Sequence, residues 1–349
     1  MGVIRLRPSG HEVTVEPGDS VLTALERAGY ALPNNCRAGA CGECKTRVLA
    51  GEFDQGVVFS MALSDEDRVA GYGLMCMARP LSQVLDIEFG TGDARPRLFP
   101  PRAGVPFVVC DLISRTPRIA ELRLRPIGDP LRYWPGQYVL LGDAAAGAPP
   151  RCYSIANAPR PDGELTLLVS RMPHGSTSRW VHQTLMLGQR VLLDGPYGTF
   201  VGDPATETPV VCLAAGSGLA PILALTDAAL RRGFPQPVTL VFSASTSADE
   251  LDVGLMRWWE QKHRNFRFII THTKGPADSR PAKRIPQLLP DLFSSLAGTS
   301  VFIAGSPQFV DDCLTAAKKL SAQDHLLHTE RYVAQYPPGT VPVPGARVS

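Results

Sequence analysis

No run of about 18 consecutive apolar residues occurs in this 349-residue sequence, so it predicts no membrane-spanning helix. The first residues, MGVIRLRPSGHEV, lack the apolar core of a secretory signal. The formal net charge is only +2, which gives no reason to expect a nucleic-acid partner. We therefore expect a cytoplasmic protein that binds neither membrane nor nucleic acid.

Cysteine is also scarce, because a disulfide scaffold of this length would need more than eight. The composition is 44% hydrophobic and 19% charged, so the chain can build buried cores and is not disordered. The 32 glycines and 32 prolines favour many turns over a helical bundle. What the eight cysteines do must therefore be read from their spacing.

Three of the cysteines fall within nine residues and form the pattern C-x4-C-x2-C, with a fourth further along. This is the plant-type [2Fe–2S] spacing. Gly39 and Gly42 lie inside the run, where a chain that wraps a cluster needs unusual backbone angles. Zinc and disulfides are alternatives, although zinc usually takes two close cysteine pairs. The predicted metal ligands are Cys36, Cys41, Cys44 and Cys76.

The residues around these cysteines predict a small mixed α+β domain over residues 1–92. We expect strands at 3–8, 11–17, 46–50 and 84–88 and helices at 21–29 and 64–70. This order resembles the β-grasp fold of plant-type ferredoxins. The resemblance implies that Cys36 and Cys41 hold one iron, and that Cys44 and Cys76 hold the other.

Two further domains are expected behind a linker rich in proline at 93–104. Residues 105–204 contain short alternating runs and one helix, near 177–187, and predict an antiparallel β-barrel. Residues 205–335 alternate apolar strands with helices near 219–232, 248–263, 283–296 and 306–321, and predict a parallel α/β sheet. Residues 336–349 are expected to be a disordered tail.

The barrel region contains the sequence Arg151-Cys-Tyr153-Ser154. It resembles the R-x-Y-S/T flavin motif of the ferredoxin–NADP⁺ reductase superfamily. Arg151 offers a forked cation to a pyrophosphate and Tyr153 offers a flat face to a flavin ring. Ser154 offers a hydroxyl to the redox-active edge of the flavin. Strand alternation puts it on the opposite side from Arg151 and Tyr153, so the twist at the strand end would have to bring it to the flavin, which the sequence leaves open.

A second flavin-phosphate segment is expected where a helix begins, because free N–H groups there can bind phosphate oxygens. Its residues are Gly175, Ser176, Thr177 and Ser178. Near the end of the chain, Glu330 resembles the glutamate of the superfamily's terminal Glu-x-aromatic segment. Tyr153, Ser154 and Glu330 are the expected flavin-tuning residues, and no residue is expected to act as a general acid or base. A last strand with a half-buried tyrosine explains residues 330–332 equally well.

A nicotinamide dinucleotide site is predicted where a strand turns into a helix through a glycine-rich sequence. The sequence G-x-G-x-x-P resembles the same superfamily, as does the later Gly-Ser-Pro turn. The predicted residues are Gly216, Gly218, Pro221, Gly305, Ser306 and Pro307. Two departures stand out. Ser243-Ala-Ser245 replaces the usual G-x-R, which favours NADH while leaving NADPH possible. Ala304 replaces the usual cysteine beside the nicotinamide.

The order ferredoxin, flavin, nicotinamide resembles the reductase components of bacterial multicomponent oxygenases. The resemblance implies that electrons pass from NADH to FAD, then to the [2Fe–2S] cluster and then to a partner. The partner would be a terminal oxygenase (a Rieske-type dioxygenase, a diiron monooxygenase or a cytochrome P450) or an intermediate ferredoxin. Aromatic degradation is the expected context and a monomer the expected state. A reductase of deoxysugar biosynthesis, a redox sensor and a zinc adaptor are the alternatives.

Charge is divided unevenly along the chain. Residues 1–90 carry 8 Lys and Arg against 12 Asp and Glu, and the remaining residues carry 27 against 21. An acidic ferredoxin domain on a basic body would steer docking. Ordinary scatter explains a difference of this size equally well.

Overall fold

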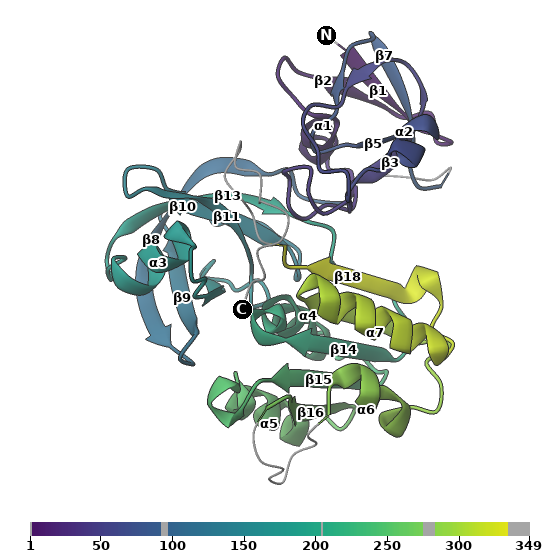
Figure 1. The fold of residues 1–349 in the computed structure, drawn as a ribbon. Coiled ribbons are helices and arrows are strands. Elements are labelled where there is room, and N and C mark those ends of the chain that lie inside the picture. Colours follow the sequence, from purple (N-terminus) through teal and green to yellow (C-terminus); the bar gives the residue numbers. More distant parts are fainter. Residues whose placement is uncertain (1, 92–96, 204, 275–282, 334–349) are drawn as a thin grey trace. The chain divides into compact units, whose positions relative to one another are not determined.

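The computed structural model describes residues 2–91, 97–203, 205–274 and 283–333. The chain divides into two compact units, Met1–Pro100 and Pro101–Tyr332, and the second contains two domains (Figure 1). The predicted tail at 336–349 and the first four residues of the predicted linker, 93–96, lie outside the described residues. The domain boundaries themselves stay predictions.

The first unit is built on a mixed five-stranded sheet in the order β2-β1-β7-β3-β5, in which only β1 and β7 run parallel. Helix α1 packs its apolar face onto this sheet. The predicted ferredoxin-type α+β fold is confirmed. The elements are β1 (Gly2–Arg7), β2 (Glu12–Val15), α1 (Val21–Arg27), β3 (Lys45–Ala50), β4 (Phe53–Asp54), α2 (Asp65–Val69), β5 (Tyr72–Leu74), β6 (Arg79–Pro80) and β7 (Val84–Glu88).

Local sequence explains these elements. Ile4 and Leu6 alternate with polar residues in β1 and are fully buried. Ser20 caps α1, because its hydroxyl accepts a hydrogen bond of 3.2 Å from the Thr23 N–H. Gly29, at a φ of +79°, turns the chain away after the helix.

The second unit begins with six antiparallel strands in the order β11-β10-β13-β8-β9-β12. A bridge between Ile155, just after β11, and Leu167 in β12 joins the two ends of this order, so the sheet curls into a half-barrel. Trp180 and Val181 of α3 fill the barrel core. The predicted barrel is confirmed. Its elements are β8 (Arg102–Ser114), β9 (Ile119–Pro126), β10 (Tyr138–Asp143), β11 (Ala148–Ser154), β12 (Leu165–Ser170), α3 (Ser176–Gln183) and β13 (Arg190–Tyr197).

A parallel sheet follows in the order β16-β15-β14-β17-β18. Helices α4 and α5 cover one face, and α6 and α7 cover the other (Figure 1). The predicted α/β domain is confirmed. Its elements are β14 (Val210–Ala215), η1 (Gly216–Gly218), α4 (Leu219–Arg231), β15 (Val238–Ala244), η2 (Ser247–Asp249), α5 (Val253–Lys262), β16 (Phe266–His272), α6 (Ile285–Leu292), β17 (Ser300–Gly305), α7 (Pro307–Lys319), η3 (Asp324–Leu326) and β18 (Leu327–Arg331).

The predicted helix at 248–263 is broken near its start. The Asp249 carboxylate accepts hydrogen bonds from the N–H and the hydroxyl of Thr246, which form a capping box around the separate short turn η2. Asp252 then adopts a left-handed conformation, with a φ of +50°, before α5 begins. In the barrel, α3 ends at Gln183 rather than 187, and β8 begins at Arg102 within the predicted linker.

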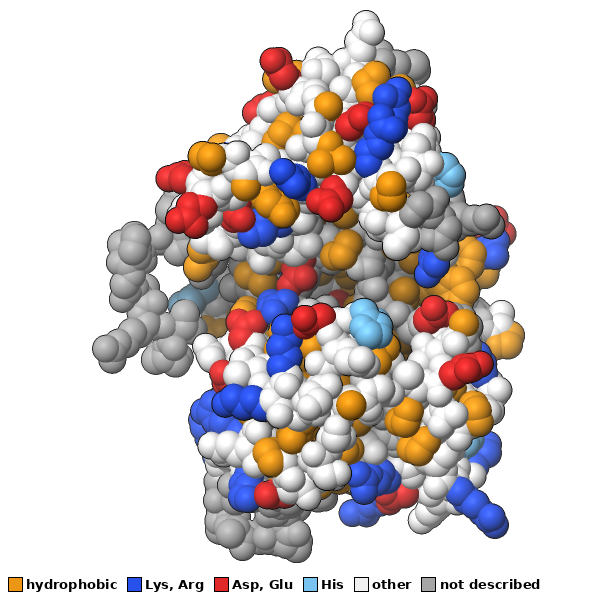
Figure 2. All heavy atoms as spheres, turned by 90° about the vertical axis from the view of Figure 1, so that its right-hand side faces the viewer, with side chains coloured by type: hydrophobic (Ala, Val, Ile, Leu, Met, Phe, Trp, Pro, Cys, Tyr) orange, Lys and Arg blue, Asp and Glu red, His pale blue; other side chains and the backbone are white. Residues whose placement is uncertain are grey.

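No helix among the described residues is long and apolar enough to cross a membrane. Figure 2 shows both signs of charge interspersed over one face of the molecule, with basic side chains frequent on the nucleotide domain. This agrees with the excess of Lys and Arg after residue 90.

Gly136 offers a test of the barrel's packing. It has a φ of +94°, and a Cβ there would lie 1.9 Å from the Phe200 carbonyl oxygen. Gly147 has a φ of +66° but open space around it. We expect Gly147→Ala to cost about 1 kcal/mol and Gly136→Ala at least about 3 kcal/mol. Chemical denaturation followed by tryptophan fluorescence measures both, and equal losses would contradict this view of Gly136.

Candidate functional site

The cysteine loop, residues 36–44, folds so that backbone N–H groups point at sulfur. Cys36 Sγ accepts from the N–H groups of Ala38, Ala40 and Cys41 at 3.5, 3.4 and 3.3 Å. Cys44 Sγ accepts from the N–H of Cys76 at 3.4 Å. Such donors stabilise negative charge on sulfur, which is the form that binds iron.

The four predicted ligands meet as two pairs. A hydrogen bond from the Cys41 side chain lowers the pKa of Cys36 to about 6, and one from Cys44 lowers the pKa of Cys76. Among the residues that the structure describes, no three Cys, His, Asp or Glu side chains converge on one point as a single metal ion requires. Two neighbouring pairs fit a two-iron cluster, with one pair on each iron.

Glycines let the loop lie close to the segment 57–62. Gly39 has a φ of +68°, its carbonyl accepts from the Phe59 N–H at 3.0 Å, and a Cβ on it would lie 2.9 Å from Val58 Cγ1. Gly42 has a φ of +79° and lies against the Ala62 backbone. Both positions therefore need glycine for conformation and for space.

A buried ion pair ties the loop to α1. Arg37, at a φ of +55°, contacts the Glu26 carboxylate at 2.5 Å, and Glu26 is 4% exposed. Burial raises the pKa of Glu26, and the Arg37 charge opposes that shift. The same arginine lowers the pKa of Cys76, so its positive charge acts on the cysteine cage.

In the barrel, β11 carries the predicted flavin motif. Tyr153 pairs with Val139 of β10 and packs against the barrel core, and burial raises its pKa. Arg151 lies two residues earlier on the same face. Ser154 lies on the other face, and its hydroxyl hydrogen-bonds the Glu330 carboxylate at 3.1 Å. The question left open by the sequence therefore has an answer: Ser154 faces the nucleotide domain.

Helix α3 begins beside the same strand. Its N-cap, Gly175, supplies no side-chain cap, so the N–H groups of the first turn are open to an acceptor. Two of the predicted hydroxyls are engaged within the protein: Thr177 donates to the Pro149 carbonyl at 2.5 Å and Ser178 donates to the Gly175 carbonyl at 3.0 Å. Thr177 thus holds the start of α3 against β11, and Ser176 stands at the first turn between them.

Glu330 is joined at the barrel by Tyr332, which follows β18. The Tyr332 hydroxyl donates to Ser154 at 2.9 Å and approaches the Ser217 carbonyl at 3.4 Å. The Ser170 hydroxyl donates to that of Ser217 at 2.8 Å. Burial and the Glu330 charge raise the pKa of Tyr332, which keeps it a hydrogen-bond donor. Neither Ser170 nor Ser217 is among the predicted site residues, although Ser217 stands inside the predicted G-x-G-x-x-P sequence.

The predicted dinucleotide residues meet at the carboxyl ends of β14 and β17, where parallel sheets bind nucleotides. Gly216 has a φ of +54°, and a Cβ there would face open space. A Cβ on Gly218 would lie 2.2 Å from the Ala304 carbonyl oxygen, so this glycine allows η1 to pack on β17. Pro221 is in the first turn of α4.

The second predicted segment begins α7. Gly305 packs against the Phe309 ring, and the Ser306 hydroxyl caps the helix by accepting from the Phe309 N–H at 3.4 Å. Pro307 occupies the first helical position, which suits its fixed φ. These three residues therefore have structural roles at the same edge of the sheet as Gly216.

Comparison with known proteins agrees with this arrangement. Residues 4–81 match the model of the 2Fe-2S iron-sulfur cluster binding domain. Residues 106–201 match the oxidoreductase FAD-binding domain, and residues 212–315 match the oxidoreductase NAD-binding domain. The reductase subunit of an aromatic O-demethylase from an Amycolatopsis species is 33% identical over 330 residues, 93% of this chain and 96% of that protein.

The chain belongs to the reductase components of multicomponent oxygenases. Other relatives are the reductase component of phenol 2-monooxygenase from a Pseudomonas species, 32% identical, and that of terephthalate 1,2-dioxygenase from a Comamonas species, 31% identical. They cover 94% and 90% of this chain, and the chain covers 94% and 92% of them. The crystal structure of an Amycolatopsis cytochrome P450 reductase matches with a TM-score of 0.85 and 31% identity, over 95% of this chain and 98% of that one.

Membership of this family defines the activity. The protein is an electron-transfer reductase that uses NAD(P)H, FAD and a [2Fe–2S] cluster to supply an oxygenase component. Of the alternatives, the zinc adaptor does not agree with the matched iron–sulfur domain.

The contact between α3 and β11 gives a test of flavin binding. We expect Thr177→Val, which removes the bond to the Pro149 carbonyl, to weaken FAD binding about fivefold, because a lost hydrogen bond costs about 1 kcal/mol. Thr184→Val, at the exposed end of the same helix, is the matched control. Equilibrium titration of flavin-free protein with FAD measures both. Equal affinities in the two variants would contradict a positioning role for Thr177.

Proposed function

We propose that the protein carries electrons from NADH to a partner oxygenase component through two sites made of specific residues. Cys36 and Cys41 hold one iron of the cluster, and Cys44 and Cys76 hold the other. The observation that carries this proposal is the meeting of the four cysteines as two pairs under backbone N–H donors. When bound, FAD accepts two electrons from NADH and the cluster passes them on one at a time.

The flavin site lies between β11 and α3. Arg151 pairs with the FAD pyrophosphate, together with the open N–H groups of the helix segment Gly175–Ser178, and Tyr153 lies against the ring. Ser154 and Glu330 tune the reactive edge, and Tyr332 joins them. In support, Thr177 fixes the helix start to the strand, and Ser154 hydrogen-bonds both Glu330 and Tyr332.

The dinucleotide binds at the carboxyl ends of β14 and β17. Gly216 leaves space for the pyrophosphate, and Gly218 and Pro221 set the turn into α4. Gly305, Ser306 and Pro307 hold the facing start of α7. No acid–base residue is required, because the protein only has to position the nicotinamide and the flavin for hydride transfer.

The finer statements about context are also proposals. The acceptor is a terminal oxygenase or an intermediate ferredoxin that serves aromatic degradation, as the printed names of the relatives suggest. The protein works as a cytoplasmic monomer, because one chain carries all three modules and its eight cysteines form no disulfide.

Cys44 tests the order of electron flow. We expect Cys44→Ser to abolish cytochrome c reduction while it spares NADH–ferricyanide activity, because ferricyanide can take electrons before they reach the cluster. Iron and sulfide analysis and steady-state assays with both acceptors measure this. Cys110→Ser, outside the loop and half-buried, is the control. Parallel loss of both activities, with FAD retained, would overturn the proposed order.

The end of β15 tests coenzyme choice. Ser245 stands where the superfamily has an arginine, and Glu250 follows nearby, held by His272 at 2.8 Å. A carboxylate without an arginine disfavours a 2′-phosphate. We expect kcat/KM with ferricyanide to favour NADH over NADPH by at least about tenfold, and Ser245→Arg to narrow that ratio. Equal values for the two coenzymes in the native chain would contradict this.

A further inference from the structure

The barrel meets the nucleotide domain through a row of polar contacts at the carboxyl edge of the parallel sheet. At one end of the row, Ser154 bonds Glu330, which is in the edge strand β18. In the middle, Ser170 bonds Ser217, just after the central strand β14. At the other end, Arg115, in the turn between β8 and β9, contacts Asp252, between β15 and α5. The row therefore spans the sheet from its edge to beyond its centre.

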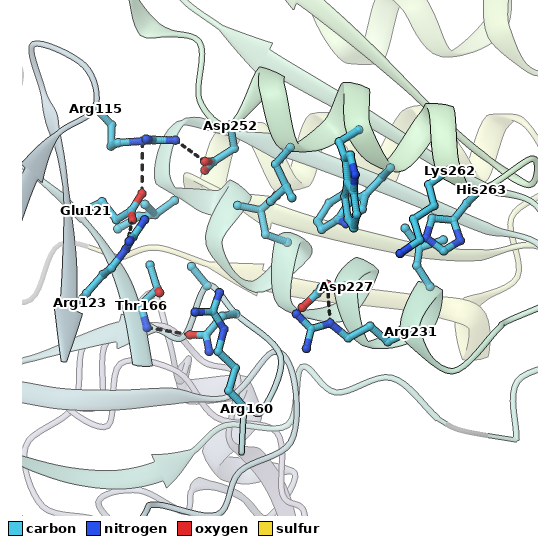
Figure 3. Close-up of a pocket in the computed structure, with 18 residues that line it drawn as sticks. Arg115, Glu121, Arg123, Arg160, Thr166, Asp227, Arg231, Asp252, Lys262 and His263 are labelled. Atoms are coloured by element: carbon cyan, nitrogen blue, oxygen red, sulfur yellow. Dashed lines mark hydrogen bonds and ion pairs between the residues drawn. The ribbon is translucent and has the colours of Figure 1, made fainter. Parts of the chain in front are cut away.

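The ion pair between Arg115 and Asp252 is part of a larger group of charged side chains. Arg115 Nη2 lies 2.5 Å from Asp252 Oδ1, and Arg115 Nε lies 3.2 Å from Glu121 Oε2 (Figure 3). Glu121 is 4% exposed and also accepts from Arg123 Nε at 2.6 Å. The guanidinium is thus held by two carboxylates, one from each domain. A fork of this kind fixes direction, which a lysine cannot do.

Asp252 is equally constrained. Its side chain is 12% exposed, and it stands in the left-handed conformation where η2 gives way to α5. Burial raises its pKa, and the Arg115 charge opposes that shift. An aspartate placed in this way is costly without its arginine, so the contact is more than a surface ion pair.

A cavity of about 780 Å³ lies directly beside this ion pair, between the barrel and helices α4 and α5 (Figure 3). Arg115, Glu121 and Arg160 line it from the barrel, and Asp252 and Trp259 line it from α5 and its cap. Close packing fixes two domains against each other only where the space between them is filled. Ile119, Ala156 and Leu168 of the barrel domain are buried in one apolar cluster with residues of α4 and α5, whereas the space beside the ion pair is not filled. The ion pair is therefore the contact that opposes tilting of the domains on the side of the cavity.

We propose that Arg115 and Asp252 are positioning residues that set the angle between the flavin and nucleotide domains for hydride transfer. The reaction at this junction moves a hydride, with both electrons, from the nicotinamide of NADH, which becomes NAD⁺, to the flavin. Its rate depends on the distance and alignment of two rings held by different domains. The contact at Ser154 and Glu330 holds one end of the interface, and the Arg115–Asp252 pair holds the other against rotation into the cavity. This inference rests on the proposed sites for FAD and NADH.

The test uses the full chain with its cofactors. Asp252→Asn removes the charge but keeps a residue that tolerates the left-handed conformation, and Arg115→Gln removes the other partner. Anaerobic stopped-flow absorbance gives the limiting rate constant of flavin reduction, the Kd for NADH and the long-wavelength charge-transfer band of the nicotinamide–flavin contact.

We expect each variant to reduce the limiting rate constant about tenfold and to weaken the charge-transfer band, since a displacement of about 1 Å can cost up to about a hundredfold. The Kd for NADH should stay within about twofold, because binding contacts lie within the nucleotide domain. The double variant should be no slower than either single variant, because one contact is lost in all three. Arg160→Gln is the matched control: it lines the same cavity but pairs with Glu164 inside the barrel, at 3.2 Å.

Three results would overturn the proposal. One is an unchanged rate constant in Asp252→Asn and Arg115→Gln. Another is an equal loss in Arg160→Gln, which would show a general effect of charge in the cavity. The third is a loss that appears only in the Kd for NADH. If the native chain itself shows no flavin reduction by NADH, the proposed function fails, and this is distinguishable from a failure of the variants alone.

Discussion

The contact between the flavin and nucleotide domains depends on the hydrogen bonds of the Ser154 hydroxyl. Ser154 lies at the end of a barrel strand, yet the two groups that it contacts belong to another domain: Glu330 is in the last strand, β18, and Tyr332 follows that strand. A hydroxyl can bond two partners at once, so this one small side chain joins two domains. Arg151 and Tyr153 lie on the other face of the strand, where the flavin is proposed to bind. Burial around Tyr332 keeps its proton in place, which preserves the junction.

The cysteine loop, residues 36–44, depends on local contacts instead. It has glycines in left-handed conformations and N–H groups aimed at sulfur. A cluster that carries one electron at a time needs a rigid cage near its own backbone, whereas hydride transfer needs two domains brought into line. The chain's division into a ferredoxin unit and a flavin–nucleotide unit matches these two needs.

This difference explains how much the sequence could predict. The cysteine spacing, the R-x-Y-S strand and the glycine-rich turn are local, so their residues and the three folds around them could be predicted from the chain alone. Tyr332 and Ser154 are 178 residues apart, and Ser170 and Ser217 are 47 apart. Three of these four residues lie in recognisable motifs, but no local pattern predicts that either pair is in contact. The predicted start of the helix at 248–263 was wrong for a related reason. Asp249 bonds Thr246 through its side chain and Asp252 adopts a left-handed backbone conformation, and hydrophobic periodicity predicts neither.

Polar contacts supplement an apolar cluster where the flavin and nucleotide domains meet, since Ile119, Leu168 and Phe200 of the barrel domain are buried together with residues of β14, β15 and α4. At the edge where the coenzyme is proposed to bind, polar groups leave the surface accessible to a charged dinucleotide, which an apolar surface would exclude. Hydrogen bonds from hydroxyls and a buried ion pair are directional. They can therefore fix the angle between the two domains over a small contact area, and the rest of the carboxyl edge of the parallel sheet stays polar. The cavity beside Arg115 is compatible with such a junction, since directional bonds and the apolar cluster hold the two domains together without filling the whole interface.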